Sequence, residues 1–449
     1  MFRLKRFYEE FKFGRNEKHG GIYFFAQANY MPTDTELIRN ILTRDFQHFA
    51  SRGFQFNEKI DPLSAHLFNL EGQKWKKLRA KLAPAFTAGK MKFMFRTLLE
   101  CASSMMEFID RLVDEDQALD IKEILACYTT DVIGSCAFGI ECNSFKHPDA
   151  EFRRYGRKIF TPSFKFAVSL ILSIILPKSV FKSIPIKKLP VEIERFFIDA
   201  IANVIDFRTK NNVRCNDFIQ LLLDMQEKAK AEGDERLTLE QISAQAFVFF
   251  IAGFETSSTT MTFCLHELAF NQEMQSKLRQ EIKQVSNKND GQITYDALME
   301  MKYMDNVINE TLRKYPPIAM LNRLCTLDYK VPNSHVTLSS GTNVFISVLG
   351  IHYDPEYYPD PEKFDPERFS EENRAERPAF TFLPFGEGPR MCTGIRFGMM
   401  QIKIGLSMLL EKYSIVPADG ENYIVDFDPR SFVLTKRGAV TLRAKKLIN

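Results

Sequence analysis

The chain has 449 residues, of which 45% are hydrophobic and 26% charged, a balance that supports a large buried core. A formal net charge of +3 gives no indication of nucleic-acid binding, and eight cysteines without paired spacings argue against a disulfide framework. The 41 phenylalanines indicate either simple core filling or aromatic walls around an apolar cavity.

The organisation of the chain shows no internal boundary. No Gly/Ser linker, low-complexity tract or repeat divides it, so we expect one domain over residues 1–449. The basic, amphipathic N-terminus lacks the apolar core of a signal peptide. An apolar stretch at residues 166–176 is too short to span a bilayer, and fits either a segment that dips into a membrane surface or a buried helix.

The predicted elements begin with short strands in residues 22–33, followed by a mostly helical region over residues 34–315. A long helix starts at Thr238, because Thr238 and Gln241 form a capping-box signature ahead of an apolar series that continues past Leu268. A second helix covers residues 304–315 and is closed by two prolines.

In the C-terminal third, the predicted structure changes from mostly helices to β segments and loops before a last long helix. Residues 329–348 predict short β segments, residues 352–369 predict loops, and a long helix follows Cys392. The tail from about residue 421 is typical of strands and turns. The fold class is therefore mainly α with a minor β portion.

The first candidate binding pair is Trp75 and Arg79, which lie one turn apart on one face of a predicted helix. An indole N–H beside a guanidinium can bind a carboxylate of a ligand. The alternative is a basic surface helix that the tryptophan anchors. Arg323 and Arg390 are further candidates for such an anion.

The middle of the long helix carries the segment Ala252-Gly253-Phe254-Glu255-Thr256. Its two small residues would let the backbone lie against a flat ligand, and the Thr256 hydroxyl can bond back to the Ala252 carbonyl and distort the turn. Glu255 and Thr256 would then form a polar notch that can relay protons. The alternative is that the small residues serve only close helix packing.

Glu310 and Arg313 lie one helical turn apart, with two prolines beyond them. On a solvated surface such a pair contributes only about 0.2–0.5 kcal/mol. Arg368, in a proline-rich loop upstream of Cys392, is a candidate third partner. A buried carboxylate between two guanidiniums would lock that loop in place.

Cys392 stands in a glycine-punctuated loop, Phe385-Gly386-Glu387-Gly388-Pro389-Arg390-Met391-Cys392-Thr393-Gly394, at the start of the last long helix. Glycines free the backbone to approach a planar cofactor, and the helix N-terminus stabilises negative charge on sulfur. This arrangement is expected of an axial thiolate ligand to haem iron. A lone cysteine is otherwise most often a buried, inert residue.

Taken together, these motifs resemble the cytochrome P450 superfamily of haem-thiolate monooxygenases over almost the whole chain. The residues that match its haem-binding signature are Phe385, Gly386, Gly388, Arg390, Cys392 and Gly394. Residues 252–256 match the oxygen-activation motif, Glu310 to Arg313 the K-helix pair, and Trp75 with Arg79 the C-helix motif. Residues 131–134 and 352–355 look like insect microsomal members of family six.

The resemblance implies a triangular helical prism with small β-sheets that holds haem b between the I and L helices. Cys392 would be the proximal iron ligand, and Glu255 and Thr256 would deliver protons. The implied partners are O2, a small lipophilic substrate, and an NADPH-dependent diflavin reductase with cytochrome b5 as a further electron donor. The expected docking face for the reductase comprises Lys74, Lys76, Lys77 and Lys403. The candidate pocket residues are Phe249, Ile251, Phe254, Ile318 and Val433.

The sequence departs from the family at its start, since it opens at what would be the amphipathic A helix, without a membrane anchor or proline-rich hinge. A peripheral location on the cytosolic face of the endoplasmic reticulum therefore rests on the resemblance and on residues 166–176. The segment Tyr30 to Thr33 also lacks the expected apolar strand, which argues against the first β-hairpin.

Two other functions stay open. A reductase-independent isomerase or peroxide-consuming enzyme is disfavoured because both Glu255 and Thr256 are present. A non-catalytic haem- or lipophile-binding protein is disfavoured by the intact Cys392, Glu310 and Arg313.

Overall fold

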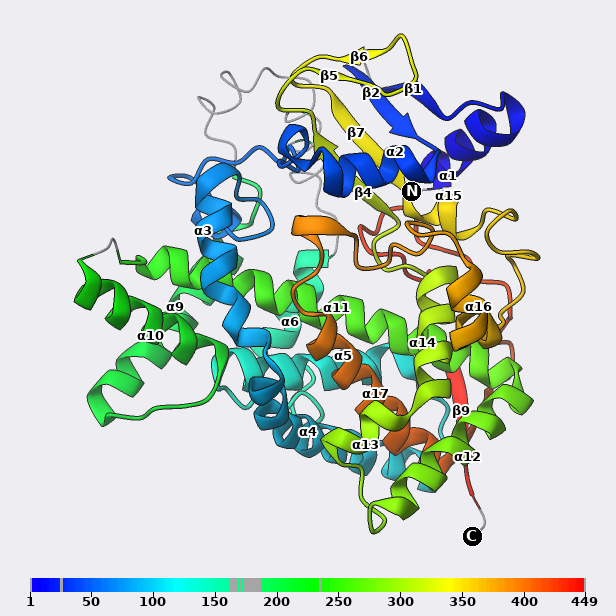
Figure 1. Ribbon diagram of the computed structural model, residues 1–449. Coiled ribbons are helices and arrows are strands. Elements are labelled where there is room, and N and C mark those ends of the chain that lie inside the picture. The colour runs from blue at the N-terminus through cyan, green and yellow to red at the C-terminus, as the bar shows by residue number, and fades with distance from the viewer. Residues whose placement is uncertain are drawn as a thin grey trace.

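The computed structural model describes residues 2–24, 27–160, 168, 172, 187–233 and 236–447. Figure 1 shows helices through most of the molecule and the largest sheet at one end, with the N-terminus beside that sheet and the C-terminus at the opposite end. The α-helices are α1 (Phe2–Glu9), α2 (Thr35–Arg39), α3 (Gly72–Leu82), α4 (Ala88–Asp114), α5 (Ile121–Ile133), α6 (Glu151–Phe160), α9 (Val191–Asn211), α10 (Phe218–Glu232), α11 (Leu239–Phe270), α12 (Gln272–Lys288), α13 (Tyr295–Glu300), α14 (Lys302–Lys314), α15 (Val348–His352), α16 (Glu371–Glu376) and α17 (Ile395–Lys412).

Shorter helical turns connect these elements. The π-helical turns are η1 (Glu10–Gly14), η2 (Asn40–Arg44) and η6 (Gly134–Phe138). The 3-10 turns are η3 (Phe46–His48), η4 (Pro62–Ser64), η5 (Ala83–Phe86), η7 (Pro366–Phe369) and η8 (Gly388–Arg390).

Helix α11 crosses the centre of the molecule and packs against α5, α9, α14 and α17 (Figure 1). The predicted capping box is present: the Gln241 amide donates to Thr238 Oγ1 over 3.2 Å, and the Thr238 amide donates to Gln241 Oε1 over 3.0 Å. Among the described helices, α11 alone has the length and apolar composition of a membrane span. Because 61% of its most apolar window is buried inside the protein, core packing accounts for that composition.

The main sheet has the strand order β1-β2-β7-β4, and Figure 1 shows it above the helices. Strands β1 (His19–Phe24) and β2 (Gln27–Pro32) pair antiparallel, β2 runs parallel to β7 (Asn343–Ser347), and β7 pairs antiparallel with β4 (Met320–Leu324). The first β-hairpin is therefore present, contrary to the expectation from residues 30–33. Tyr30 pairs with Gly21 on one side and Val344 on the other, so backbone pairing overrides the mixed side chains of residues 30–33.

Two smaller sheets complete the β portion. One has the order β3-β9-β8, formed by β3 (Leu119–Asp120), β9 (Thr441–Lys446) and β8 (Tyr413–Pro417), and the other joins β5 (Tyr329–Lys330) to β6 (Thr337–Leu338). Within the described part of the tail after residue 421, the strand structure is β9 and one bridge between Phe427 and Lys436. The mainly α class with a minor β portion is confirmed.

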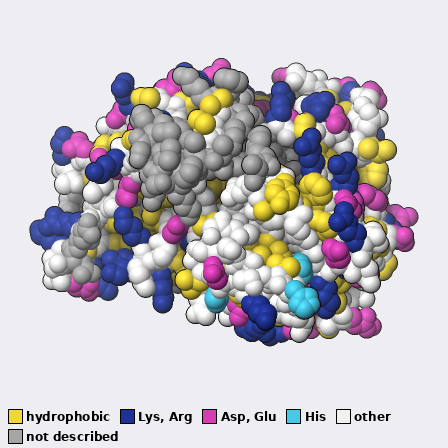
Figure 2. Space-filling view, turned by 90° about the horizontal axis from the view of Figure 1, so that it is seen from above, with side chains coloured by type: hydrophobic (Ala, Val, Ile, Leu, Met, Phe, Trp, Pro, Cys, Tyr) yellow, Lys and Arg dark blue, Asp and Glu magenta, His cyan; other side chains and the backbone are white. Residues whose placement is uncertain are grey.

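The hydrophobic core is divided between the helical body and the sheet end. On the face in Figure 2, hydrophobic side chains lie among lysines, arginines and acidic residues.

At the sheet end, Tyr8 of α1 is buried and donates a hydrogen bond to Asp354 Oδ2 over 2.7 Å, which fixes the N-terminal helix to the segment after α15. Apart from residues 168 and 172, the apolar stretch at 166–176 lies outside the described residues.

Candidate active site

The Cys392 loop is a tight turn that leads into α17. The Cys392 amide donates to the Phe385 carbonyl over 2.9 Å, and the Gly386 amide donates to the Leu383 carbonyl over 3.0 Å. Gly386 and Gly388 have φ angles of +68° and +73°, which L side chains rarely adopt. Although helices surround the loop, Cys392 is an exposed residue, whereas five of the other cysteines are buried. The backbone thus presents the thiol to a space beside the loop.

Although Cys392 is open to the space beside the loop, the surrounding protein desolvates its thiol and raises the pKa above the ordinary value. The backbone amide of Gly394 and the guanidiniums of Arg52 and Arg79 act in the opposite direction, because each stabilises the thiolate. Such a thiol becomes a thiolate when a metal ion binds to it.

Helix α3 holds the predicted Trp75 and Arg79 against this loop. Arg79 Nη2 donates to the Met391 carbonyl over 2.9 Å. The Arg390 guanidinium lies 4.0 Å from the centre of the Trp75 ring, and it donates to the carbonyls of Ala50 (2.9 Å) and Leu70 (2.7 Å). The surface-helix alternative for Trp75 therefore does not hold, since the indole is buried between the helix and the loop.

A fourth arginine, Arg52, joins the group although the sequence reasoning missed it. Its Nη2 donates to the Arg390 carbonyl over 2.9 Å, and its pKa falls well below the ordinary value through burial and the charges of Arg323, Arg390 and Arg79. The segment Ser51-Arg52-Gly53 has no motif that predicts a site residue, because only the fold brings Arg52 to the Cys392 loop.

These four guanidiniums form a cluster in which the only opposing charge on Arg390 from the described residues, that of Glu71, acts from beyond ion-pairing distance. No ion pair joins Arg52, Arg79, Arg323 or Arg390 to any carboxylate of the described residues. Arg323 Nε and Arg390 Nη1 are buried without a hydrogen-bond partner among those residues. Burial and the neighbouring positive charges lower the pKa of Arg390 to about 9. A buried group of this kind is matched to an anionic ligand.

The polar notch of α11 has the predicted backbone bond. Thr256 Oγ1 donates to the Ala252 carbonyl over 2.6 Å. Ala252 is exposed within a helix that is otherwise largely buried, and burial raises the pKa of Glu255, against the opposing charges of Lys122 and Arg153. A carboxyl with a raised pKa can hold a proton closer to neutral pH.

Contacts on both sides of this notch place it beside the start of α17. The Phe249 and Phe397 rings lie 5.7 Å apart, and a Cβ added to Gly398 would lie 3.8 Å from Ser257 Oγ. The segment 252–256 is therefore held close to the helix that begins just after Cys392.

Two residues of the motif do not share the face of Ala252. A Cβ on Gly253 would lie 2.4 Å from Ile133 Cδ1, so this glycine permits α5 to pack against α11 rather than a flat ligand to approach. Phe254 is buried against Phe250, with ring centres 5.7 Å apart, and Phe160 lies at 5.9 Å. The expectations of cofactor contact at Gly253 and of a pocket wall at Phe254 are corrected accordingly.

The buried ion cluster predicted around Glu310 is present. Arg313 donates from Nε (2.7 Å) and Nη2 (2.8 Å) to the two carboxylate oxygens, and Arg368 Nε lies 3.5 Å from Glu310 Oε1. The Asp365 amide donates to Glu310 Oε1 over 2.9 Å. The carboxylate thereby holds the loop around η7 against α14.

The remaining pocket candidates lie in two groups. Phe249 stacks on Phe218 with ring centres 4.7 Å apart, and Ile251 is partly buried two residues along α11. Ile318 is partly buried and Val433 is buried. The Leu434 amide donates to the Pro317 carbonyl over 3.0 Å, which brings the segments of Val433 and Ile318 together.

Comparison with known proteins identifies the family. The cytochrome P450 family model matches residues 12–442. The chain belongs to the cytochrome P450 family. It is 42% identical to "Probable cytochrome P450 6a14" of Drosophila melanogaster, over 99% of this chain and 89% of that protein. It is also 42% identical to "Cytochrome P450 6A1" of Musca domestica, over 97% of this chain and 86% of that protein. The chain is therefore a haem-thiolate monooxygenase, as its motifs indicated.

The residues around Cys392 fit the haem of a cytochrome P450. Haem b needs an axial ligand, donors for two propionates and an apolar surface on its other face. The exposed thiol of Cys392, the orphaned guanidinium nitrogens of Arg323 and Arg390, and the exposed methyl of Ala252 meet these three needs.

One lysine of the expected docking face is not on the surface. Lys403 is buried, with its Nζ 2.7 Å from Asp305 Oδ1 and 2.8 Å from the Leu298 carbonyl. Its position on the inner face of α17 makes it a structural residue of this cytochrome P450. By contrast, Lys74, Lys76 and Lys77 are exposed on α3.

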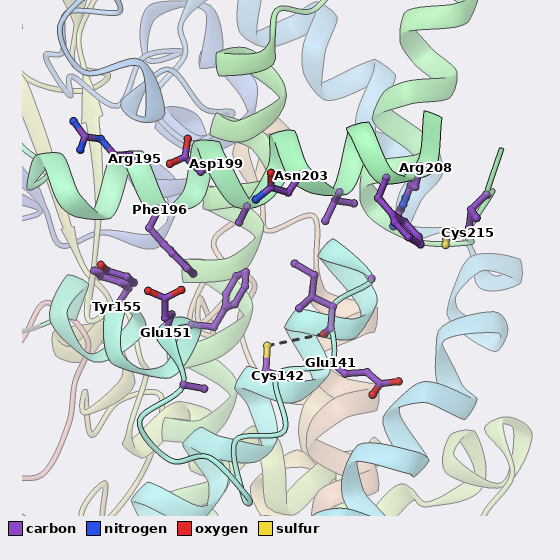
Figure 3. Close-up of a pocket in the computed structure, with 18 of the residues that line it drawn as sticks. Glu141, Cys142, Glu151, Tyr155, Arg195, Phe196, Asp199, Asn203, Arg208 and Cys215 are labelled. Carbon is purple, nitrogen blue, oxygen red and sulfur yellow. Dashed lines mark hydrogen bonds between the residues drawn. The ribbon is translucent and has the colours of Figure 1, made fainter. Parts of the chain in front are cut away.

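A separate groove of about 860 Å³ lies between α6, α9 and residues 139–142 (Figure 3). In this view Phe196 of α9 points toward α6, whereas Arg195 and Asp199 point away from it. None of the residues that line this groove belongs to the Cys392 loop, the arginine cluster or the α11 notch. The groove is therefore distinct from the candidate active site.

Proposed function

We propose that this cytochrome P450 takes electrons from NADPH through a diflavin reductase and oxidises small lipophilic molecules. The observation that carries the proposal is the exposed Cys392 thiol beside four guanidiniums, none of which has a carboxylate of the described residues within ion-pairing distance. A bound haem supplies the redox chemistry that activates dioxygen. We assign this catalytic role to one domain comprising residues 1–449.

The protein's contribution to the cofactor is binding and orientation. Cys392 would be the axial ligand, with Phe385, Gly386 and Gly394 shaping its loop. Trp75, Arg79, Arg323 and Arg390 would hold the propionates, with Arg52 beside them. The guanidinium N–H groups suit carboxylates because they can donate in pairs.

Glu255 and Thr256 would manage protons on the opposite side. Burial raises the pKa of Glu255, so its carboxyl group holds a proton to a higher pH than an exposed glutamate does. The Thr256 hydroxyl, held by the Ala252 carbonyl, keeps its oxygen available as an acceptor beside that acid. This pair favours a monooxygenase over an isomerase or a peroxide-consuming enzyme.

The apolar surroundings support a lipophilic substrate. Phe249 and Ile251 lie on the α11 side, and Ile318 and Val433 come from two segments joined through Leu434. Xenobiotics, insecticides and hormone-like lipids are the substrate classes we propose. Such molecules gain affinity chiefly from the apolar area that they bury.

The electron donors would dock beside α3. Lys74, Lys76 and Lys77 are exposed there, and Arg79 of the same helix bonds to the loop of Cys392. An acidic reductase would be steered to this face, and cytochrome b5 would use it as well. We propose a position on the cytosolic face of the endoplasmic reticulum membrane, with the sheet end nearest the membrane, since Tyr23 of β1 is 72% exposed there.

The carbon monoxide difference spectrum of the reduced haem-loaded protein tests this function. We expect a Soret band at the strongly red-shifted thiolate position, its loss in Cys392→Ala, and its retention in the control Cys215→Ala. A band at the histidine-like position in the unaltered protein would contradict the proposal. Product formation with NADPH and reductase, but little with peroxide alone, separates the monooxygenase from the peroxide-consuming alternative.

A further inference from the structure

Residues 313 and 352 are joined by reciprocal hydrogen bonds. Arg313 Nη1 donates to the His352 carbonyl over 2.9 Å, and His352 Nδ1 lies 3.0 Å from the Arg313 carbonyl. Both side chains are fully buried. Because a carbonyl oxygen can only accept, the proton of the neutral imidazole must reside on Nδ1.

The other ring nitrogen reaches the segment that leads to Cys392. The Leu383 amide donates to His352 Nε2 over 2.9 Å, so one neutral tautomer satisfies both bonds. Burial, together with the charge of Arg313, lowers the pKa of His352 to about 3, which keeps the imidazole neutral at physiological pH. The Phe382 ring stacks on the imidazole, with centres 5.4 Å apart and planes at 22°.

From Leu383 the connection to the thiol is short. The Leu383 carbonyl accepts from the Gly386 amide over 3.0 Å, which closes the first turn of the loop. The carbonyl of Phe385, inside that turn, accepts from the Cys392 amide over 2.9 Å. The imidazole therefore fixes Leu383, two residues before the loop, on one side, and the C-terminal end of α14 on the other.

We propose that His352 is a positioning residue for the Cys392 ligand, acting as a rigid link between the Glu310–Arg313 helix and the start of the Cys392 loop. It acts through Leu383 and touches neither substrate nor haem. The inference rests on the proposed function, in which Cys392 ligates the iron. In the sequence, His352 is distinguished only by the resemblance of residues 352–355 to the insect members of the family.

The test compares three variants of the haem-loaded protein. His352→Leu removes both bonds, and His352→Gln keeps a donor and an acceptor in the side chain. His266→Leu is the matched control, because His266 is also fully buried and bonded to a backbone carbonyl, that of Tyr423, but has no link to the Cys392 loop. The readout is the thiolate band of the reduced carbon monoxide complex, measured per bound haem, and the rate at which it converts to the histidine-like position.

We expect this conversion to be roughly tenfold faster in His352→Leu than in the unaltered protein, since a buried amide loses its acceptor. His352→Gln should bring the conversion rate most of the way back to that of the unaltered protein. His266→Leu should show the same conversion rate as the unaltered protein. If His352→Leu does not fold, His352→Asn takes its place, because its shorter amide reaches one partner at most and should convert faster than the Gln variant.

Equal conversion rates in the His352 variants and the unaltered protein would overturn the inference. So would equal rates in the His352 variants and His266→Leu, or a Gln variant no better than Leu or Asn. These outcomes differ from a failure of the proposed function, in which the unaltered protein itself would lack the thiolate band.

Discussion

A Cβ atom placed on Gly388 would lie 2.0 Å from the carbonyl oxygen of Leu42. The Cys392 loop is thus packed directly on the backbone of η2, more than 300 positions earlier in the chain. No side chain can be accommodated at this contact without movement of one backbone or the other.

We predict that Gly388→Ala destabilises the protein by about 3 kcal/mol, through the contact with Leu42 and the positive φ. Gly291→Ala is the matched control, because its φ of +75° is similar but nothing lies within 4 Å of the added Cβ. It should lose only about 1–2 kcal/mol. Denaturant unfolding measures both, and equal losses would show that the Leu42 contact carries no energy.

Removal of the buried carboxylate charge in Glu310→Gln should destabilise the protein by about 3–5 kcal/mol, because two guanidiniums lose their partner. The control is Glu151→Gln, which alters an exposed pair with Arg154 at the same i,i+3 spacing. That change should stay within about 0.5 kcal/mol. Thermal unfolding of both variants distinguishes a buried structural pair from a solvated one.

The contribution of two buried histidines to the free energy of unfolding should fall as pH is lowered from about 6.5 toward 3. Burial lowers the folded-state pKa of both His66 and His352 to about 3. The unfolded chain therefore binds more protons than the folded protein in this window. Each neutral histidine contributes its full stabilisation above its ordinary pKa, and this contribution is lost as pH falls toward the folded-state pKa. The loss amounts to about 1.4 kcal/mol per pH unit for each histidine. In His66→Phe, urea unfolding between pH 4 and 6 should show a correspondingly smaller slope, and an unchanged slope would contradict the assignment.

Thr256→Ala should lower the product formed per NADPH consumed by about tenfold or more, because it removes the hydroxyl that we propose for proton delivery. Thr256→Ser should retain coupling. Thr260→Ala provides the control, since Thr260 makes the same backward bond, to the Thr256 carbonyl over 2.8 Å, one turn further along α11. Similar uncoupling in both alanine variants would point to a helix distortion instead.

Charge reversal at Lys76 and Lys77 should raise the KM for reductase, with an effect that shrinks at high salt. Lys403→Met should leave that KM unchanged but lower the melting temperature, since the bonds to Asp305 and the Leu298 carbonyl are lost. Steady-state reduction kinetics and thermal unfolding test the two effects separately. A KM change in Lys403→Met without loss of stability would reverse our placement of this lysine.

Features that depend on neighbours in the chain were predictable from the sequence. The capping box at Thr238 and Gln241 and the bond from Thr256 to Ala252 each span one turn, so residue types and spacing suffice. The ion cluster of Glu310 was predictable because a buried carboxylate requires partners and Arg368 was a suitable one.

Features that depend on contacts between distant segments were not predictable from the sequence. The sequence pattern could not show that Gly253 faces Ile133 or that Lys403 turns inward to Asp305. Arg52 has no local motif, and the link from His352 to Leu383 depends on the path of the intervening loops. In each case tertiary packing selects one role among several that the residue type allows.

The arginine cluster has a consequence for the protein before its cofactor binds. The neighbouring guanidiniums lower the pKa of Arg52 and Arg390 in the folded state, and the unfolded chain is free of that repulsion. Any dianion that settles among them adds to the folding free energy in proportion to the logarithm of its concentration. The haem-free protein should therefore become more heat-stable in phosphate or succinate than in chloride at equal ionic strength. Haem binding and folding would then be thermodynamically coupled.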